Sequence, residues 1–187
     1  MTDGHTSIYI FGYGSLIHPG SANTTLGRSA TPALFPTATL TYYARCWSYA
    51  TSMRRSGAAE DDPARGVALN IVPDIQAHCN GVLIEVTPEE LARLDDRETY
   101  YDRVDVSYQT LPDDLDQAAE AITVYTYVGQ REKRRLPPGA FISTRYDAVV
   151  REGAALYGED FAQAFVQTTR PHTLPIREAV YPNDPVK

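Results

Sequence analysis

The alternation of apolar and polar positions predicts a chain built mainly of β-strands. Residues 8–11 form a short apolar run that stops at Gly12 and Gly14, as a buried strand entering a tight turn does. Residues 38–50 are rich in β-branched and aromatic side chains, which favour strands. Further strands are expected at 66–72, 81–86, 104–108 and 122–128, with a turn at Pro73 and Asp74 and surface loops at 53–65 and 112–120.

Helices are expected in three places. Thr87 is followed by a proline and, three residues on, by Glu90, which is a capping box that starts a helix at Thr87. A second helix should run from Thr144 to the residue before Gly158, and a short third one over 160–168. Consecutive strands with few helices predict an α+β fold, in which a mixed, mostly antiparallel sheet or small β-barrel has flanking helices.

Chain length and the C-terminal sequence determine the expected domain organisation. With 187 residues and no internal repeat, the chain is expected to form a single domain over 1–187. Residues 170–187 contain Pro171, Pro175, Pro182 and Pro185, so this tail is expected to be an extended surface segment.

Charge and composition limit the classes of partner and the cellular location that we expect. The formal net charge of -7 argues against nucleic acid and anionic membranes as partners. There is no apolar run of bilayer length, and residues 1–7 lack the basic start of a secretory signal, so we predict a cytoplasmic protein. Cys46 and Cys79 have no metal-like spacing and are expected to be packed thiols. The histidines, which are likewise interpreted as non-ligands, are His5, His18, His78 and His172.

Glu98 is the informative carboxylate. In the helix that starts at Thr87, Leu91 and Leu94 form an apolar stripe, and Glu98 follows on that stripe four residues later. Burial raises the pKa of a carboxyl group, which is what a general base working near neutral pH needs. The alternative is that the helix has ended by Arg97, with Glu98 in a solvated loop or paired with Arg103.

The glycine turn at residues 11–17 is the second feature with chemical content. A strand that runs into Gly-x-Gly-Ser turns sharply, and its backbone N–H groups can form an anion or oxyanion site, although a purely structural turn explains the same residues. Ile17 stands where a dinucleotide fingerprint or a nucleophile elbow would need glycine. His18 is too close in sequence to act easily as a base for Ser15.

Basic and aromatic residues give weaker indications of a functional site. The run 131–135 is basic but short and contains Glu132, which favours a solvated loop over a phosphate site. The chain has 13 Tyr against 5 Phe, and tyrosines either line polar pockets or occupy half-buried strand positions.

Four segments in order resemble the γ-glutamylcyclotransferase-like superfamily, which includes ChaC-related enzymes. The tetrapeptide Tyr13-Gly14-Ser15-Leu16 is similar to its YGSL signature, and residues 81–86 resemble the strand before its catalytic helix. The stretch from Leu94 to Arg103 resembles the segment of the superfamily that contains the catalytic Glu. Residues Thr144-Arg145-Tyr146 resemble the tyrosine-bearing helix near the C-terminal end of the superfamily domain. The resemblance spans roughly residues 8–169, and it departs at Thr99, where a glycine is common, and beyond Arg170.

The resemblance implies an enzyme with a defined site. Glu98 would be the catalytic acid/base, and the substrate would lie against Tyr13, Gly14, Ser15, Leu16 and Tyr146. The implied reaction cyclises a small-molecule γ-glutamyl substrate to 5-oxoproline and releases an amine or amino acid, with no metal and no cofactor. Glutathione, a γ-glutamyl dipeptide and a γ-glutamylamine remain open as substrates, as do a monomer and a homodimer. An amide hydrolase or acyltransferase using the same pocket, and a non-catalytic binding module, are the alternatives.

Overall fold

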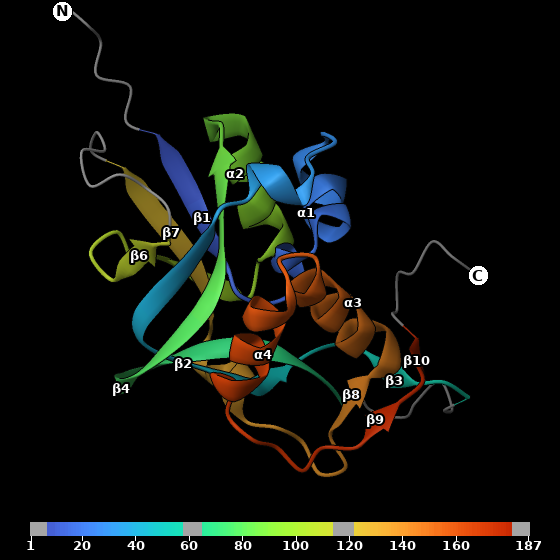
Figure 1. The fold of residues 1–187 in the computed structure, drawn as a ribbon. Coiled ribbons are helices and arrows are strands. Elements are labelled where there is room, and N and C mark those ends of the chain that lie inside the picture. The colour runs from blue at the N-terminus through green and yellow to red at the C-terminus, as the bar shows by residue number, and fades with distance from the viewer. Residues whose placement is uncertain (1–6, 58–64, 114–121, 181–187) are drawn as a thin grey trace, which may run out of the picture.

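The computed structural model describes residues 7–57, 65–113 and 122–180 (Figure 1). Its strands are β1 Ile8–Gly12, β2 Thr37–Ala50, β3 Arg54–Arg55, β4 Gly66–Val86, β5 Tyr101–Asp105, β6 Thr110–Pro112, β7 Thr123–Gly129, β8 Phe141–Ser143, β9 Ile176–Arg177 and β10 Ala179–Val180. Its α-helices are α1 Pro19–Leu26, α2 Pro88–Arg97, α3 Thr144–Ala155 and α4 Glu159–Gln167, and its 3₁₀ turns are η1 Ser15–Ile17, η2 Pro32–Leu34 and η3 Arg131–Arg134.

One large sheet organises the chain. Its strands follow the order β5-β7-β1-β4-β2-β6, and β8 and β9 extend it from β4. The pairs β1–β4, β2–β4, β2–β6 and β5–β7 are antiparallel, while β1–β7, β4–β8 and β8–β9 are parallel. This confirms the expected α+β fold with a mixed, mostly antiparallel sheet. The described strands form an open path, so the curled sheet resembles a barrel without closing into one.

The centre of the sheet differs from the prediction made for residues 66–86. Two strands with a turn at Pro73 and Asp74 were expected, but β4 is one strand of 21 residues. Its pairing with β2 is irregular at this point, because Tyr43 pairs with Pro73 whereas Thr41 pairs with His78. The turn signal therefore marks a bulge in a long antiparallel ladder, and the pairing with β2 on either side keeps the strand continuous.

The bounds predicted for the strand at 104–108 were also wrong. β5 begins at Tyr101 and ends at Asp105, whose carboxylate accepts hydrogen bonds from the amide and hydroxyl of Ser107 and turns the chain. Tyr108 is consequently exposed, and the short strand β6 at Thr110–Pro112 was not predicted. The expected acidic loop at 112–120 lies largely outside the described residues.

Helix α2 begins where its capping signal indicates. Both hydrogen bonds of the capping box between Thr87 and Glu90 are present at the start of α2. Ser143 caps α3 by accepting from the Tyr146 amide, and α4 follows after Gly158. Figure 1 shows α1 and α2 together at one end of the sheet and α3 and α4 in front of its lower part.

The core lies between the sheet and these helices, and its fully buried side chains include Ile10, Leu40, Ile71, Val82, Ile84, Leu94 and Val150. Cys46 and Cys79 are free thiols, and burial raises the pKa of Cys79 to about 11. In the part of the chain that the structure describes, no helix is long and apolar enough to cross a membrane.

The segment after α4 runs along the surface of the molecule. It pairs through β9 with β8 and through β10 with β3. β3 lies within residues 53–65, which were expected to form a loop throughout, and residues 58–64 lie outside the described part. Residues 131–134 form the 3₁₀ turn η3, none of whose side chains is buried.

Candidate active site

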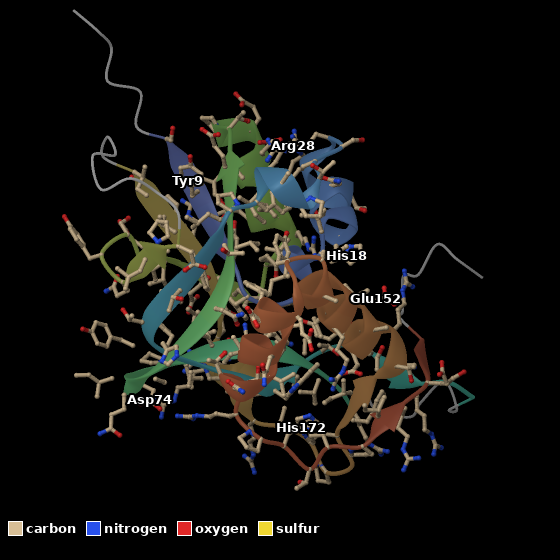
Figure 2. All side chains as sticks on the ribbon, viewed as in Figure 1. Tyr9, His18, Arg28, Asp74, Glu152 and His172 are labelled. Carbon is tan, nitrogen blue, oxygen red and sulfur yellow. The ribbon has the colours of Figure 1, made fainter. Side chains whose placement is uncertain are left out.

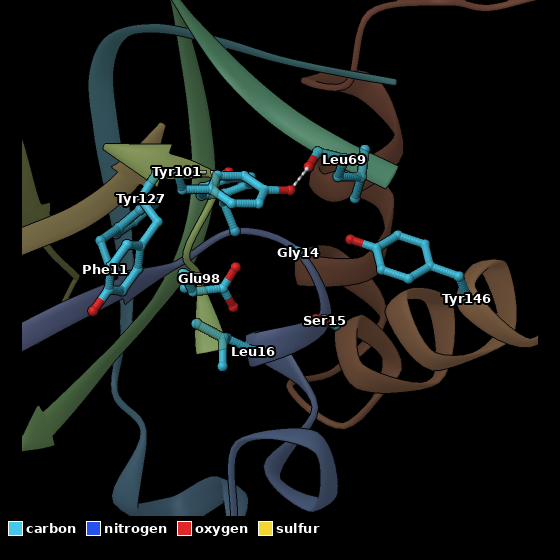
Figure 3. Close-up of a pocket in the computed structure, with 11 residues that line it drawn as sticks. Phe11, Gly14, Ser15, Leu16, Leu69, Glu98, Tyr101, Tyr127 and Tyr146 are labelled. Atoms are coloured by element: carbon cyan, nitrogen blue, oxygen red, sulfur yellow. Dashed lines mark hydrogen bonds between the residues drawn. The ribbon is translucent and has the colours of Figure 1, made fainter. Parts of the chain in front are cut away.

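The chain turns sharply after β1 and returns as a 3₁₀ turn. The amides of Ile17 and His18 donate to the carbonyls of Gly14 and Ser15. Gly12 eases this close return, since a Cβ there would lie 3.1 Å from Cβ of Leu16, which is a tight contact. The turn brings residues 13–16 to the edge of a pocket, where their backbone lies beside Glu98 (Figure 3).

Glu98 lies at the C-terminus of α2, where the helix ends. Its amide donates to Leu94 at 2.9 Å, and its carbonyl accepts from Tyr101 at 2.8 Å. The helix therefore ends at Arg97, as the alternative interpretation supposed, but the Glu98 side chain is only 16% exposed and lines the pocket. Burial raises the pKa of the Glu98 carboxyl, while the neighbouring Arg97 guanidinium partly opposes the rise.

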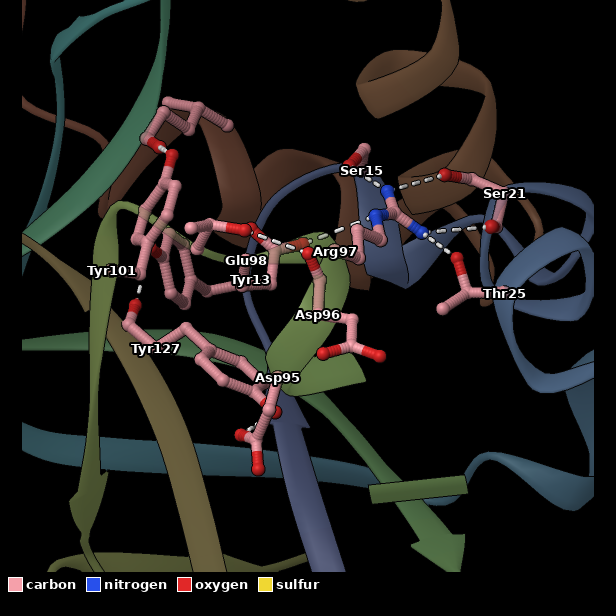
Figure 4. Close-up of polar contacts among 12 residues, drawn as sticks. Tyr13, Ser15, Ser21, Thr25, Asp95, Asp96, Arg97, Glu98, Tyr101 and Tyr127 are labelled. Atoms are coloured by element: carbon pink, nitrogen blue, oxygen red, sulfur yellow. Dashed lines mark hydrogen bonds and ion pairs between the residues drawn. The ribbon is translucent and has the colours of Figure 1, made fainter. Parts of the chain in front are cut away.

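Arg97, which the sequence analysis did not single out, connects Glu98 to the turn. Its Nε lies 3.1 Å from Oε1 of Glu98. Its Nη2 donates to the Ser15 and Ser21 hydroxyls at 3.1 and 3.2 Å, and its Nη1 donates to the Ser21 carbonyl and the Thr25 hydroxyl at 3.0 and 2.8 Å (Figure 4). These contacts hold the guanidinium in one position beside the carboxylate. Arg103, the partner considered from the sequence, instead pairs with Asp95.

Ser15 and His18 do not form a nucleophile and base pair. The Ser15 hydroxyl accepts from the Arg97 guanidinium, which cannot act as a base. His18 is the N-cap of α1, and its Nδ1 accepts from the Gly20 amide at 3.0 Å. Among the described residues no group of three or more His, Cys, Asp or Glu could hold a metal ion.

Tyr146 approaches the turn from α3. A Cβ on Gly14 would lie only 3.1 Å from the Tyr146 hydroxyl oxygen, so the absence of a side chain at Gly14 allows this approach. Figure 3 shows the Tyr146 hydroxyl pointing toward Gly14 and the Glu98 carboxylate. The Tyr146 ring rests edge-on against Trp47, with a centroid separation of 5.8 Å.

Other tyrosines form the opposite wall and hold the pocket together. Tyr13 donates to the Tyr127 carbonyl at 2.7 Å, Tyr127 to Asp95 at 2.9 Å, and Tyr101 to the Leu69 carbonyl at 3.4 Å. Burial raises the pKa of all three phenols, so they remain protonated hydrogen-bond donors. Tyr101 and Tyr127 were missed as site residues, although the high tyrosine content was a signal for a tyrosine-lined pocket.

Arg45 supports the turn through a hydrogen bond, and the sequence analysis did not identify it as part of the site. It is fully buried in β2, and its guanidinium donates to the carbonyls of Asn80 at 2.6 Å, Phe165 at 2.8 Å and Tyr13 at 3.5 Å. Desolvation lowers the pKa of Arg45 to about 10, so it remains charged at neutral pH. Because its partners lie far away in the sequence, no local pattern indicates that this arginine is buried.

The six residues proposed from the resemblance converge on one pocket. Glu98, Tyr146 and the turn residues Tyr13, Gly14, Ser15 and Leu16 all line it, together with Phe11, Gly12, Leu69, Tyr101 and Tyr127. Its volume of about 40 Å³ is small, given that one water needs roughly 10–15 Å³ on such a measure. The arrangement thus places a partly desolvated carboxylate beside the backbone of the turn and the Tyr146 side chain.

Comparisons with known proteins agree with this picture. The family model described as gamma-glutamyl cyclotransferase, AIG2-like, matches residues 10–146. A solved structure named gamma-glutamyl cyclotransferase is 17% identical, with 92% of this chain and 94% of that chain covered and a TM-score of 0.59. An uncharacterized human protein is also 17% identical, with 93% and 95% covered and a TM-score of 0.59.

YkqA from Bacillus subtilis shares the fold at 20% identity and a TM-score of 0.57, with 91% of this chain and 56% of that longer chain covered. No curated protein sequence matches the chain significantly.

Proposed function

Since the chain belongs to the AIG2-like gamma-glutamyl cyclotransferase family, we propose that it cyclises a γ-glutamyl compound to 5-oxoproline, with Glu98 as the acid/base. The proposal rests on one observation. The largely buried carboxylate of Glu98 lines the same small pocket as residues 13–16 and Tyr146. A carboxylate in such surroundings is a stronger base than one in water, because burial raises its pKa.

In the proposed reaction, the substrate supplies both the nucleophile and the acyl group. Its α-amino group has a pKa of about 8 and arrives mainly as ammonium, which cannot attack. Glu98 accepts one ammonium proton, and the freed nitrogen attacks the γ-carbonyl carbon to close a five-membered ring. After the attack the ring nitrogen carries two hydrogens and a positive charge. The C–N bond to the leaving group breaks as Glu98 passes its proton to the departing nitrogen, and the carboxylate then takes the second proton from the ring nitrogen and gives it to the released amine. The products are 5-oxoproline and an amine or amino acid, and no water is consumed.

The other pocket residues are assigned to binding and to charge stabilisation. We assign the backbone amides of residues 13–16 to the α-carboxylate or to the tetrahedral oxyanion, and the Tyr146 hydroxyl to the substrate head group. Because the nucleophile and the carbonyl belong to one molecule, holding the substrate in a folded conformation supplies much of the rate. The small volume supports recognition of the γ-glutamyl head, with the leaving group extending outward.

The product test separates this proposal from hydrolysis and from simple binding. The protein is incubated with glutathione, a γ-glutamyl dipeptide and a γ-glutamylamine, and 5-oxoproline and the released amine are quantified. Equal amounts of the two products are expected from at least one substrate. The matching N-acetyl-γ-glutamyl compound, whose amine is blocked, should not react. Release of free glutamate would indicate a hydrolase, and binding without products would indicate a non-catalytic module.

A further inference from the structure

A second and larger groove is lined by Trp47, whose ring contacts that of Tyr146 in the first pocket. It is bounded by Trp47 of β2, Val150 and Arg151 of α3, Phe165 of α4, and Arg170 and His172 from the segment after α4. In Figure 2, His172 lies on the irregular segment beneath α4, away from His18. The groove has a volume of about 260 Å³, compared with about 40 Å³ for the pocket at Glu98.

The floor of the groove is aromatic and fixed in place. Trp47 is 8% exposed and contacts the His172 ring edge-on at 5.6 Å. Phe165 is held from behind by the Arg45 guanidinium, which lies 3.6 Å from the ring centroid. An apolar cavity of about 150 Å³ accommodates benzene. The groove therefore has room for an aromatic ring that carries a short chain.

Two guanidinium groups, those of Arg151 and Arg170, stand at the rim of the groove. Each has a carboxylate partner, so the two ion pairs together carry no net charge. Asp147 accepts from Nε of Arg151 at 2.8 and 2.9 Å, and Asp74 pairs with Arg170. Both arginine side chains are more than half exposed, at 58% and 51%, so their guanidinium groups lie at the solvent boundary above the apolar floor.

From this combination we propose that the groove is a second ligand site, separate from the Glu98 pocket, for a small aryl-alkyl carboxylate. The aromatic ring lies on Trp47 and Phe165, and the carboxylate pairs with Arg151 and Arg170 at the rim. Burial of the ring provides most of the affinity, and the guanidinium N–H groups that Asp147 and Asp74 do not use, such as the Nη groups of Arg151, donate to the carboxylate. The pair of Trp47 and Tyr146 separates this site from the pocket at Glu98.

The site contains its own reporter, because Trp47 is the only tryptophan in the chain. Its fluorescence is followed while 3-phenylpropionate is added to the intact protein, with 3-phenylpropanamide and 3-phenylpropylamine as the neutral and cationic counterparts. We expect a saturable change that is tightest for the carboxylate and weakest for the amine, and that weakens as salt is added. Equal binding of all three compounds, or no saturable change with the carboxylate, would overturn the proposal.

Substitutions at the rim test where the carboxylate of the ligand binds. Arg151→Gln and Arg170→Gln should each weaken 3-phenylpropionate binding about two- to fivefold, as expected for exposed charge pairs, and should leave the amide unaffected. Val166→Glu, at an exposed rim position, should also weaken the carboxylate selectively. Glu98→Gln should not change the titration. Loss of binding in Glu98→Gln with no effect at the rim would place the compound in the Glu98 pocket and contradict the proposal.

Discussion

Two opposing influences act on the Glu98 carboxylate. Its burial beside the turn raises its pKa, and the Arg97 guanidinium at 3.1 Å lowers it, with burial the larger effect. Arg97 is itself held by Ser15, Ser21 and Thr25, so its charge stays at a fixed distance from the carboxylate. In the proposed mechanism, this balance sets the pH range in which Glu98 can accept a proton.

The pH dependence of turnover tests this balance. A general base must be deprotonated, so kcat/KM should fall on the acidic side at a pH above the ordinary carboxyl pKa of 4.5. Arg97→Gln removes the cation that favours the deprotonated form, and the acidic limb should therefore move to higher pH. Arg97→Lys should move it less.

The basic limb provides an internal control for the Arg97 variants. It reflects the substrate amine, with a pKa of about 8, and should stay in place. An acidic limb that is unchanged or moves to lower pH in Arg97→Gln would mean that Arg97 does not tune Glu98.

At the scale of elements, the site depends on how closely the turn after β1 meets α3. Gly14→Ala would place a Cβ 3.1 Å from the Tyr146 hydroxyl, so Tyr146 must shift by a few tenths of an ångström. Because small misplacements are costly in catalysis, we expect turnover to fall about tenfold while the fold is retained. Steady-state kinetics and thermal unfolding of the same preparation measure the two effects.

Gly27 offers the matched control for Gly14. It ends α1 with a φ of 72°, and nothing lies within 4 Å of an added Cβ. Gly27→Ala should lower the free energy of unfolding by about 1 kcal/mol and leave turnover unchanged, because its strain is local. If the two alanine variants lost activity equally, the approach of Tyr146 to the turn would have no special role.

At the scale of the whole molecule, Arg45 joins β2, β4, α4 and the turn after β1. Arg45→Met would remove this donor from the buried carbonyl of Asn80 and one of two side-chain donors from the Phe165 carbonyl, which keeps the Thr169 hydroxyl. An unsatisfied buried group costs about 1–3 kcal/mol, so we expect a loss of about 2 kcal/mol or more in urea unfolding. Arg55→Met, at an exposed position of β3, should change stability by less than about 0.5 kcal/mol. Similar small losses in both variants would show that Arg45 is not the structural link described here.

Local signals predicted the fold well, and distant contacts account for what they missed. The glycines that stop β1 and the capping box that starts α2 act within a few residues, so they can be read from the sequence. The continuity of β4 across Pro73 depends on pairing with β2, and the burial of Arg45 depends on Asn80 and Phe165, which no short window contains.

The site follows the same division between local and distant information. Leu91 and Leu94 indicate that the stripe leading to Glu98 faces inward, and the glycine pattern indicates the turn. The resemblance supplied Tyr146 and the role of the turn in substrate binding. Periodicity did not reveal that α2 ends at Arg97, nor that Arg97 turns back to contact Glu98 and Ser15.

Turnover of Glu98→Gln, measured beside Ser15→Ala, tests the central claim most directly. Gln preserves the shape of Glu98 but cannot accept a proton and return it, so kcat for 5-oxoproline formation should fall roughly a hundred- to ten-thousand-fold, with a smaller change in KM. Ser15→Ala should lose far less, because the turn is proposed to act through backbone amides. An active Glu98→Gln together with an inactive Ser15→Ala would contradict the account and point to a serine nucleophile.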